Sequence, residues 1–203
     1  AAVNAHADDL IDMATTSPEE LCKAVVGFAK MRIAAPTLLA AVEQRAEEYV
    51  SSLDTDPHAL ANTVWGFATL GCPAPTLLHE VEKRLELFIA ARNPHDITNI
   101  LWGFAALDMI DRTNTRRVDF LATLWNSLIT LIDTKDMNKQ AFRQLSQFET
   151  ACQVEINAAA FKSKFVTPSF ELRTRIKQAV TDDLSTIHIP PHAKEIATLL
   201  SGM

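Results

Sequence analysis

Glycine, tyrosine and basic charge are scarce in this chain of 203 residues. None of its five glycines has the spacing of a phosphate-binding loop, and a single tyrosine argues against an all-β fold. The net charge of −6 is unlike that of a polycationic nucleic-acid clamp. Three scattered cysteines argue against a disulfide framework or a zinc finger, and every uncharged apolar stretch is too short to span a bilayer. The sequence therefore predicts a soluble protein from a reducing compartment.

Catalytic signatures are missing as well. The chain contains no nucleophile elbow, no His-Glu-x-x-His motif and no Walker motif. We therefore expect no enzymatic activity, no metal site and no cofactor.

An internal repeat dominates what is present. The segment DPHALANTVWGFATLGCPAPTLL at 56–78 aligns with NPHDITNILWGFAALDM at 93–109 and with SPEELCKAVVGFAKMRIAAPTLL at 17–39. The copies begin 39 and 37 residues apart, at Pro18, Pro57 and Pro94. A fourth, degenerate copy is predicted from Asp136, with Phe142 at the place of Trp102.

Each copy is predicted to form two helices. The first helix opens with a polar capping residue followed by proline, as in Ser17-Pro18, Asp56-Pro57 and Asn93-Pro94. The second begins near Pro75 in the second copy and runs from about Asn114 to Ile132 in the third. Because one such pair cannot bury its apolar face alone, neighbouring pairs must stack.

The predicted fold is therefore all-α: a right-handed α-solenoid of antiparallel helix pairs with a C-terminal helical cap. Its parts are an N-terminal segment (1–16), a repeat array (17–152, divided into 17–55, 56–92, 93–132 and a partial 133–152) and the cap (153–203).

A glycine recurs in the middle of each first helix, where it costs about 1 kcal/mol relative to alanine. Its recurrence predicts a close approach by a neighbouring helix, and the adjacent tryptophans are predicted to form wedges between repeats. The residues expected in this packing are Gly27, Phe28, Trp65, Gly66, Phe67, Trp102, Gly103 and Phe104.

The block ANTVWGFATLG, with its echo TNILWGFAAL, resembles the octotricopeptide or heptatricopeptide repeats of organellar proteins, which occur beside FAST-kinase-like and RAP segments. The resemblance covers 17–132 well and 133–152 weakly. In the first copy, Val26 replaces the tryptophan and Lys23 the asparagine, and no RAP-like segment follows. The resemblance implies an α-solenoid, residence in a mitochondrion or plastid, and RNA binding.

Two sets of residues are candidates for RNA contact. One polar side chain per first helix recurs at a position from which helical repeats read bases, with Cys22, Ala61 and Thr98 beside it. Basic residues gather in the second half, where residues 111–203 carry a net charge of +2 against −5 for residues 1–55. The predicted RNA-binding residues are Lys23, Asn62, Asn99, Arg112, Arg116, Arg117, Lys139 and Arg143.

Two functions remain open on the sequence. The first is a non-catalytic scaffold that contacts protein and RNA within an organellar ribonucleoprotein, with a mitochondrial ribosome favoured. The second is a purely structural accessory subunit of an organellar respiratory or photosynthetic complex, without RNA contact. The basic second half favours the first function, and the short, acidic array favours the second. Both imply protein partners and no membrane insertion.

Overall fold

Polar side chains cap the first helix of each repeat in the computed structural model. The Ser17 Oγ accepts the Glu20 amide at 3.3 Å while a Glu20 carboxylate oxygen accepts the Ser17 amide at 3.0 Å, which is a complete capping box. Asp56, Asn93 and Asn138 each accept an amide from the first turn of the helix that follows. The structure describes residues 16–53, 56–132, 137–156 and 158–181.

These ranges are helical and contain no strand, as the repeat pattern predicts. The first helices of the four copies are α1 (Pro18–Met31), α4 (Pro57–Leu70), α7 (Pro94–Ala106) and α9 (Lys139–Glu155). The remaining helices are α2 (Pro36–Gln44), α3 (Ala46–Ser52), α5 (Pro75–Glu82), α6 (Leu85–Ala91), α8 (Thr115–Ile132), α10 (Ala158–Lys164) and α11 (Phe170–Thr181). None of them is both long and apolar enough to cross a bilayer.

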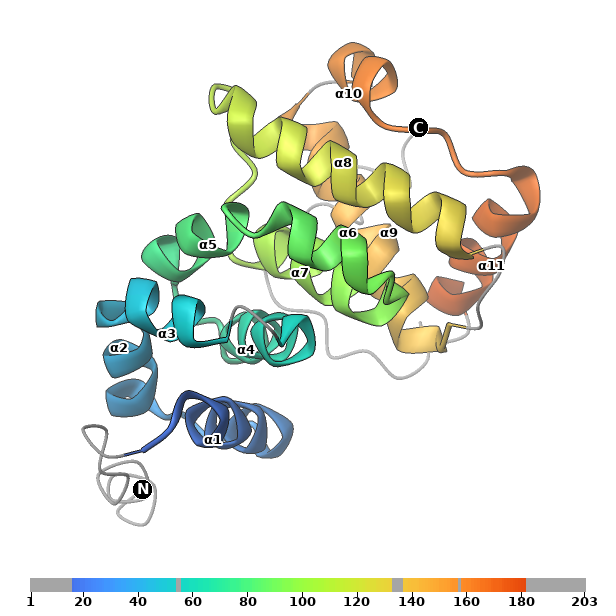
Figure 1. Cartoon of the computed structure of the whole chain (residues 1–203). Helices are drawn as coiled ribbons and strands as arrows, with labels where there is room; N and C mark the ends of the chain where they lie inside the picture. Colours follow the sequence, from blue (N-terminus) through green and yellow to red (C-terminus); the bar gives the residue numbers. More distant parts are fainter. Residues whose placement is uncertain (1–15, 54–55, 133–136, 157, 182–203) are drawn as a thin grey trace.

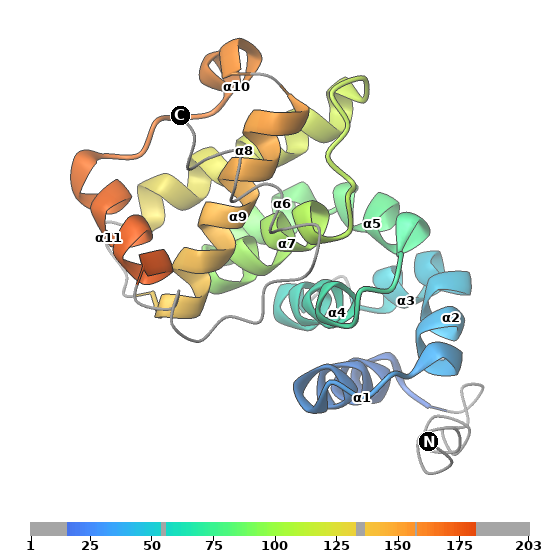
Figure 2. The same ribbon diagram turned by 180° about the vertical axis from the view of Figure 1, so that it is seen from behind.

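The first helices lie side by side in one row, α1 against α4, α4 against α7 and α7 against α9 (Figure 1). The second helices form another layer, in which α2 and α3 contact α5, and α6 contacts α8; the view from behind shows the same order (Figure 2). Large apolar side chains fill the space between the layers, and each is worth about 1.5–3 kcal/mol when fully buried. The largest of these fully buried side chains are Trp125, Phe67, Phe88, Phe104 and Phe148.

The second helix is divided in the first two repeats. The backbone leaves the helix at Arg45 (φ −109°, ψ 24°) and again at Arg84 (φ −108°, ψ 26°), which are equivalent positions. In the third repeat α8 is continuous. The single second helix expected from Pro75 onward is therefore two short helices, α5 and α6.

The fourth first helix begins later than the sequence pattern predicts. Its cap, Asn138, lies 45 residues after Asn93, so Gln147 and not Phe142 occupies the position of Trp102. Phe142 is buried instead. The predicted start at Asp136 lies outside the described residues.

The last described helix, α11, packs against α9 and runs in the opposite direction to it. Arg143, near the start of α9, donates through Nε to the carbonyl of Ala179 near the end of α11 at 3.1 Å. The Arg175 guanidinium lies over the Phe142 ring, 4.8 Å from its centroid. Because these contacts join the start of one helix to the end of the other, α11 runs antiparallel to α9. The rest of the predicted cap, residues 182–203, lies outside the described residues.

Only one of the three thiols is expected to react in the folded protein. All three cysteines are free; Cys22 and Cys152 are buried and Cys72 is half-buried. Burial raises the pKa of the Cys22 and Cys152 thiols and so lowers their thiolate fraction. An aromatic disulfide reagent should therefore titrate about one thiol per chain without denaturant and three after unfolding. Three equally fast thiols in the native protein would contradict the packing of α1 and α9.

Candidate nucleic-acid interface

One stripe of each first helix escapes full burial. On α7 it consists of His95, Asn99 and Trp102, which lie four and three residues apart and so share one face. The stripe recurs at the equivalent positions of α4 and α9, except that Gln144 on α9 is buried, with 6% of its surface exposed. Its central residues, here called the amide–tryptophan face, are Asn62, Trp65, Asn99, Trp102, Gln144 and Gln147.

Hydrogen bonds join the amides of this face across three helices. Gln144 Nε2 donates to Asn99 Oδ1 at 3.4 Å, and Asn99 Nδ2 donates to Asn62 Oδ1 at 3.4 Å. Asn62 Nδ2 lies 2.9 Å from His58 Nε2, and His58 Nδ1 lies 2.7 Å from Asp96 Oδ1. The recurring asparagine therefore bonds to its counterparts on neighbouring helices.

Glycines allow a close approach between α1 and α4 and between α4 and α7, the pair that the Asn99–Asn62 bond joins. A Cβ on Gly66 would meet Val25 Cγ1 of α1 at 2.5 Å, and a Cβ on Gly103 would collide with Val64 Cγ1 of α4. Each valine thus occupies the space of the missing side chain on the next helix. Gly27 has no described atom within 4 Å of its Cβ position, so the close approach expected there is not seen within the described ranges.

The two tryptophans lie on the open side of the row. Trp65 and Trp102 are both partly exposed, and Trp102 Nε1 donates to Gln147 Oε1 at 2.5 Å. Trp102 therefore contacts the next repeat at its edge, and the wedge role expected of the two tryptophans stays a prediction. The phenylalanines predicted beside them, Phe28, Phe67 and Phe104, are buried.

The residues next to the recurring polar position face inward. Cys22, Ala61 and Thr98 are buried, so they cannot line the open side. Lys23 occupies the equivalent polar position on α1 and is exposed. The structure therefore brings Asn62 and Asn99 together in one chain of hydrogen bonds.

The predicted basic residues are dispersed. Arg112 precedes α8 and Arg116 lies in its first turn, both exposed, and Lys139 is exposed at the start of α9. Arg143 is partly buried and bonds to α11. These residues belong to different ends of the array and form no single basic patch.

Arg117 has a structural environment. Its Nε pairs with Glu82 Oε1, its Nη1 donates to the Met109 carbonyl at 3.2 Å, and its guanidinium lies 5.7 Å from the Phe104 ring centroid. The Arg117 and Glu82 side chains are only 10% and 2% exposed. Because the guanidinium is already paired and enclosed, the expectation of an RNA contact at Arg117 is corrected.

Two further basic side chains lie on α11, which packs against α9. Burial raises the pKa of Glu149 on α9, and the nearby positive charges of Arg173 and Lys177 oppose that rise. Both basic residues are exposed. They place positive charge beside the α9 end of the row.

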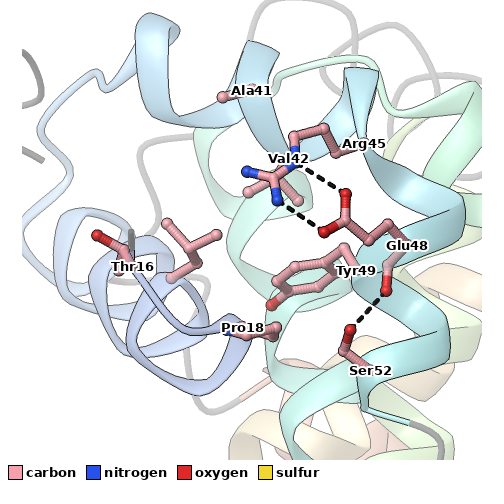
Figure 3. Close-up of a pocket in the computed structure, with 9 residues that line it drawn as sticks. Thr16, Pro18, Ala41, Val42, Arg45, Glu48, Tyr49 and Ser52 are labelled. Atoms are coloured by element: carbon pink, nitrogen blue, oxygen red, sulfur yellow. Dashed lines mark hydrogen bonds and ion pairs between the residues drawn. The ribbon is translucent and has the colours of Figure 1, made fainter. Parts of the chain in front are cut away.

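A cavity of about 210 Å³ opens between the start of α1 and the helices α2 and α3 (Figure 3). Apolar groups form part of its wall, and an ion pair of 2.8 Å between Arg45 and Glu48 lies beside it (Figure 3). Tyr49 contributes its ring while its hydroxyl bonds to Thr63 Oγ1 at 2.7 Å. The Ser52 hydroxyl donates to the Glu48 carbonyl at 2.8 Å, and the Glu48 carboxylate pairs with Arg45. Within the described ranges, no three His, Cys, Asp or Glu side chains gather as metal ligands.

Sequence reasoning missed Gln144, Gln147, His58 and Asp96. The two glutamines could have been found from the caps, because counting from Asn138 as from Asn93 aligns them with Asn99 and Trp102. No sequence signal pairs His58 with Asp96, since they lie in different repeats at non-equivalent positions.

Comparisons with other proteins supply no relative. No family model matches the chain, and neither a curated protein nor a solved structure is significantly similar to it. The resemblance to octotricopeptide repeats therefore stays a prediction from the motif.

Proposed function

We propose that this chain is a non-catalytic helical-repeat scaffold that binds single-stranded RNA within an organellar ribonucleoprotein, with a mitochondrial ribosome as the favoured particle. The observation that supports this is the amide–tryptophan face, where amides in register across three helices lie beside two half-exposed indoles. The side-by-side row of first helices is the arrangement expected of a right-handed α-solenoid.

The chemistry of the face suits unstacked bases. Each asparagine amide has two N–H groups and two oxygen lone pairs. On both Asn62 and Asn99, the bonds along the row use one N–H group and one oxygen lone pair. Each of these two amides therefore keeps one free donor and one free acceptor. Amides can bond to the edges of bases, and indole rings can stack on their faces.

The electrostatics favour a component over a free-standing reader. RNA affinity depends strongly on phosphate neutralisation, and here the exposed basic residues are dispersed. Arg173 and Lys177 supply positive charge at one end of the row. A short face of this kind gains strength when neighbouring subunits also hold the RNA.

Replacing Trp102 with leucine is expected to weaken binding of a single-stranded oligonucleotide about 5- to 150-fold, because stacking on an aromatic contributes about 1–3 kcal/mol per base. Binding should quench the intrinsic fluorescence of the wild-type protein, since Trp65 and Trp102 are accessible and Trp125 is fully buried. Fluorescence titration with oligonucleotides measures both effects.

Met31→Ala is the matched control, because Met31 is 61% exposed at the end of α1, a helix that carries no residue of the amide–tryptophan face. It should bind RNA like the wild type. Equal affinity for Trp102→Leu and the wild type, or equal loss in both variants, would overturn the placement of the interface.

Sedimentation of the tagged protein tests the assembly. Association with a large particle that dissociates after ribonuclease treatment supports the ribonucleoprotein. Migration with a membrane complex, unchanged by ribonuclease, would instead support the accessory subunit of a respiratory or photosynthetic complex.

A further inference from the structure

The hydrogen bonds that link Gln144, Asn99, Asn62 and His58 all point the same way. Starting from Gln144, each amide nitrogen donates to the next acceptor: to Asn99, then to Asn62, then to His58 Nε2. His58 Nδ1 ends the series at Asp96 Oδ1. The amides therefore share one orientation. Exchanging the nitrogen and oxygen of any one amide would break its bonds to its neighbours in the series.

Asp96 is the fixed end of this series. Its side chain is 3% exposed and lies in the first turn of α7, where the helix dipole favours a negative charge. An ionised carboxylate only accepts hydrogen bonds, so His58 must carry its proton on Nδ1. In the neutral imidazole, the form that fits the contact with Asn62 Nδ2, Nε2 is then an acceptor, and it requires the nitrogen of Asn62 and not the oxygen.

We propose that Asp96, acting through His58, sets the orientation of the amides of Asn62, Asn99 and Gln144. Asp96 is thus a positioning residue for the face, and it does not itself touch a ligand. The inference of a fixed orientation stands on the contacts alone; its consequence for RNA rests on the proposed function.

The consequence concerns which base edges fit. With the bonds in this direction, the free donor and the free acceptor of Asn62 are arranged in the same order as those of Asn99. Successive bases must then present their own donor and acceptor in one repeated order. Reversing the amides would exchange donors for acceptors at every rung, so Asp96 would determine which base is preferred without changing the stacking or the charge of the face.

The substitution Asp96→Asn tests the proposal in the full-length ¹⁵N-labelled chain. An asparagine can offer either an oxygen or an N–H to His58, so it no longer selects the Nδ1–H tautomer. Nitrogen spectra should show Nδ1–H alone in the wild type and a mixture of tautomers in the variant. The side-chain amide signals of Gln144 should shift or double, although Gln144 lies on another helix and is reached only through the series.

Glu20→Gln is the matched control, because Glu20 occupies the same turn of α1 and caps that helix without a histidine partner. It should leave the Gln144 signals unchanged. His58→Ala, at a side chain that is 64% exposed, provides a second variant that keeps the fold. In that background Asp96→Asn should no longer affect Gln144.

Three outcomes overturn the orientation role: a wild-type His58 protonated on Nε2, Gln144 signals indifferent to Asp96→Asn, or an undiminished effect in the His58→Ala background. A role of Asp96 in helix stability alone predicts the second of these, with a lower unfolding midpoint.

The RNA arm uses oligoadenylate and oligocytidylate. The ratio of their dissociation constants should change about fivefold or more in Asp96→Asn, because one bidentate pair discriminates between bases by at least that factor. An unchanged ratio with altered Gln144 signals would overturn the selection of bases. If the spectra respond as expected and the wild type binds neither oligonucleotide, the proposed function fails while the orientation role stands.

Discussion

The variant Gly103→Leu should lose about 3 kcal/mol of its free energy of unfolding, whereas Gly27→Leu should gain up to about 1 kcal/mol. At Gly103 any side chain collides with Val64 of the preceding helix, and overpacking of this kind costs about 1–3 kcal/mol or more. At Gly27 no described atom lies within 4 Å, so only the helix propensity changes, and leucine is the better helix former. Urea denaturation of both variants measures the difference.

A compensating change tests the cause. Removing the Cγ atoms of Val64 makes room for a small side chain, so Val64→Ala should reduce the cost of Gly103→Ala. A double-mutant cycle on the unfolding free energies would show this coupling. Strict additivity of the two substitutions would show that the cost at Gly103 has another origin.

Breaking the pair between Glu82 and Arg117 should be the most damaging single change, at about 3–5 kcal/mol for either Glu82→Ala or Arg117→Ala. The side chains are 2% and 10% exposed, so removal of one partner leaves an enclosed charge without its counterion. Arg117 also bonds to the Met109 carbonyl and lies over Phe104, which adds to its loss.

Removing both charges should cost less than the sum of the two single changes, because neither charge is then left unpaired. Thermal and urea unfolding of the two single variants and of Glu82→Ala/Arg117→Ala would measure the coupling. Arg112→Ala is the control, since Arg112 is exposed a few residues away and should change stability by less than about 0.5 kcal/mol. A loss of less than 1 kcal/mol in Arg117→Ala would contradict the enclosed pair.

The all-helical architecture could be predicted because its signals are local. Ser17, Asp56 and Asn93 each precede a proline, and this pairing marks a helix start whatever surrounds it. The fourth start was misplaced because Asn138 has no proline after it and the spacing lengthens there to 45 residues. Variation in connection length is invisible to a search for a fixed period.

The details of the face depended on contacts between distant residues. Trp65 and Trp102 are apolar, so their periodicity predicts burial, but a helix packed on several sides leaves open only the stripe that its neighbours do not cover. Arg117 is charged, so composition predicts exposure, and the partner that encloses it lies 35 residues earlier. In both cases the exposure of the side chain depends on which distant part of the chain packs against it.

The valines that fill the sites at Gly66 and Gly103 also have a mechanical consequence. On α4 and on α7 the space above the glycine holds a valine of the preceding helix. The neighbouring helices cannot slide along each other, because the valine would then clash with the next residue. The distance between Asn62 and Asn99 is therefore fixed in the free protein. A flexible single-stranded nucleic acid must adjust the distance between its bases to this fixed spacing. The conformational free energy lost on binding is then lost by the ligand and not by the protein.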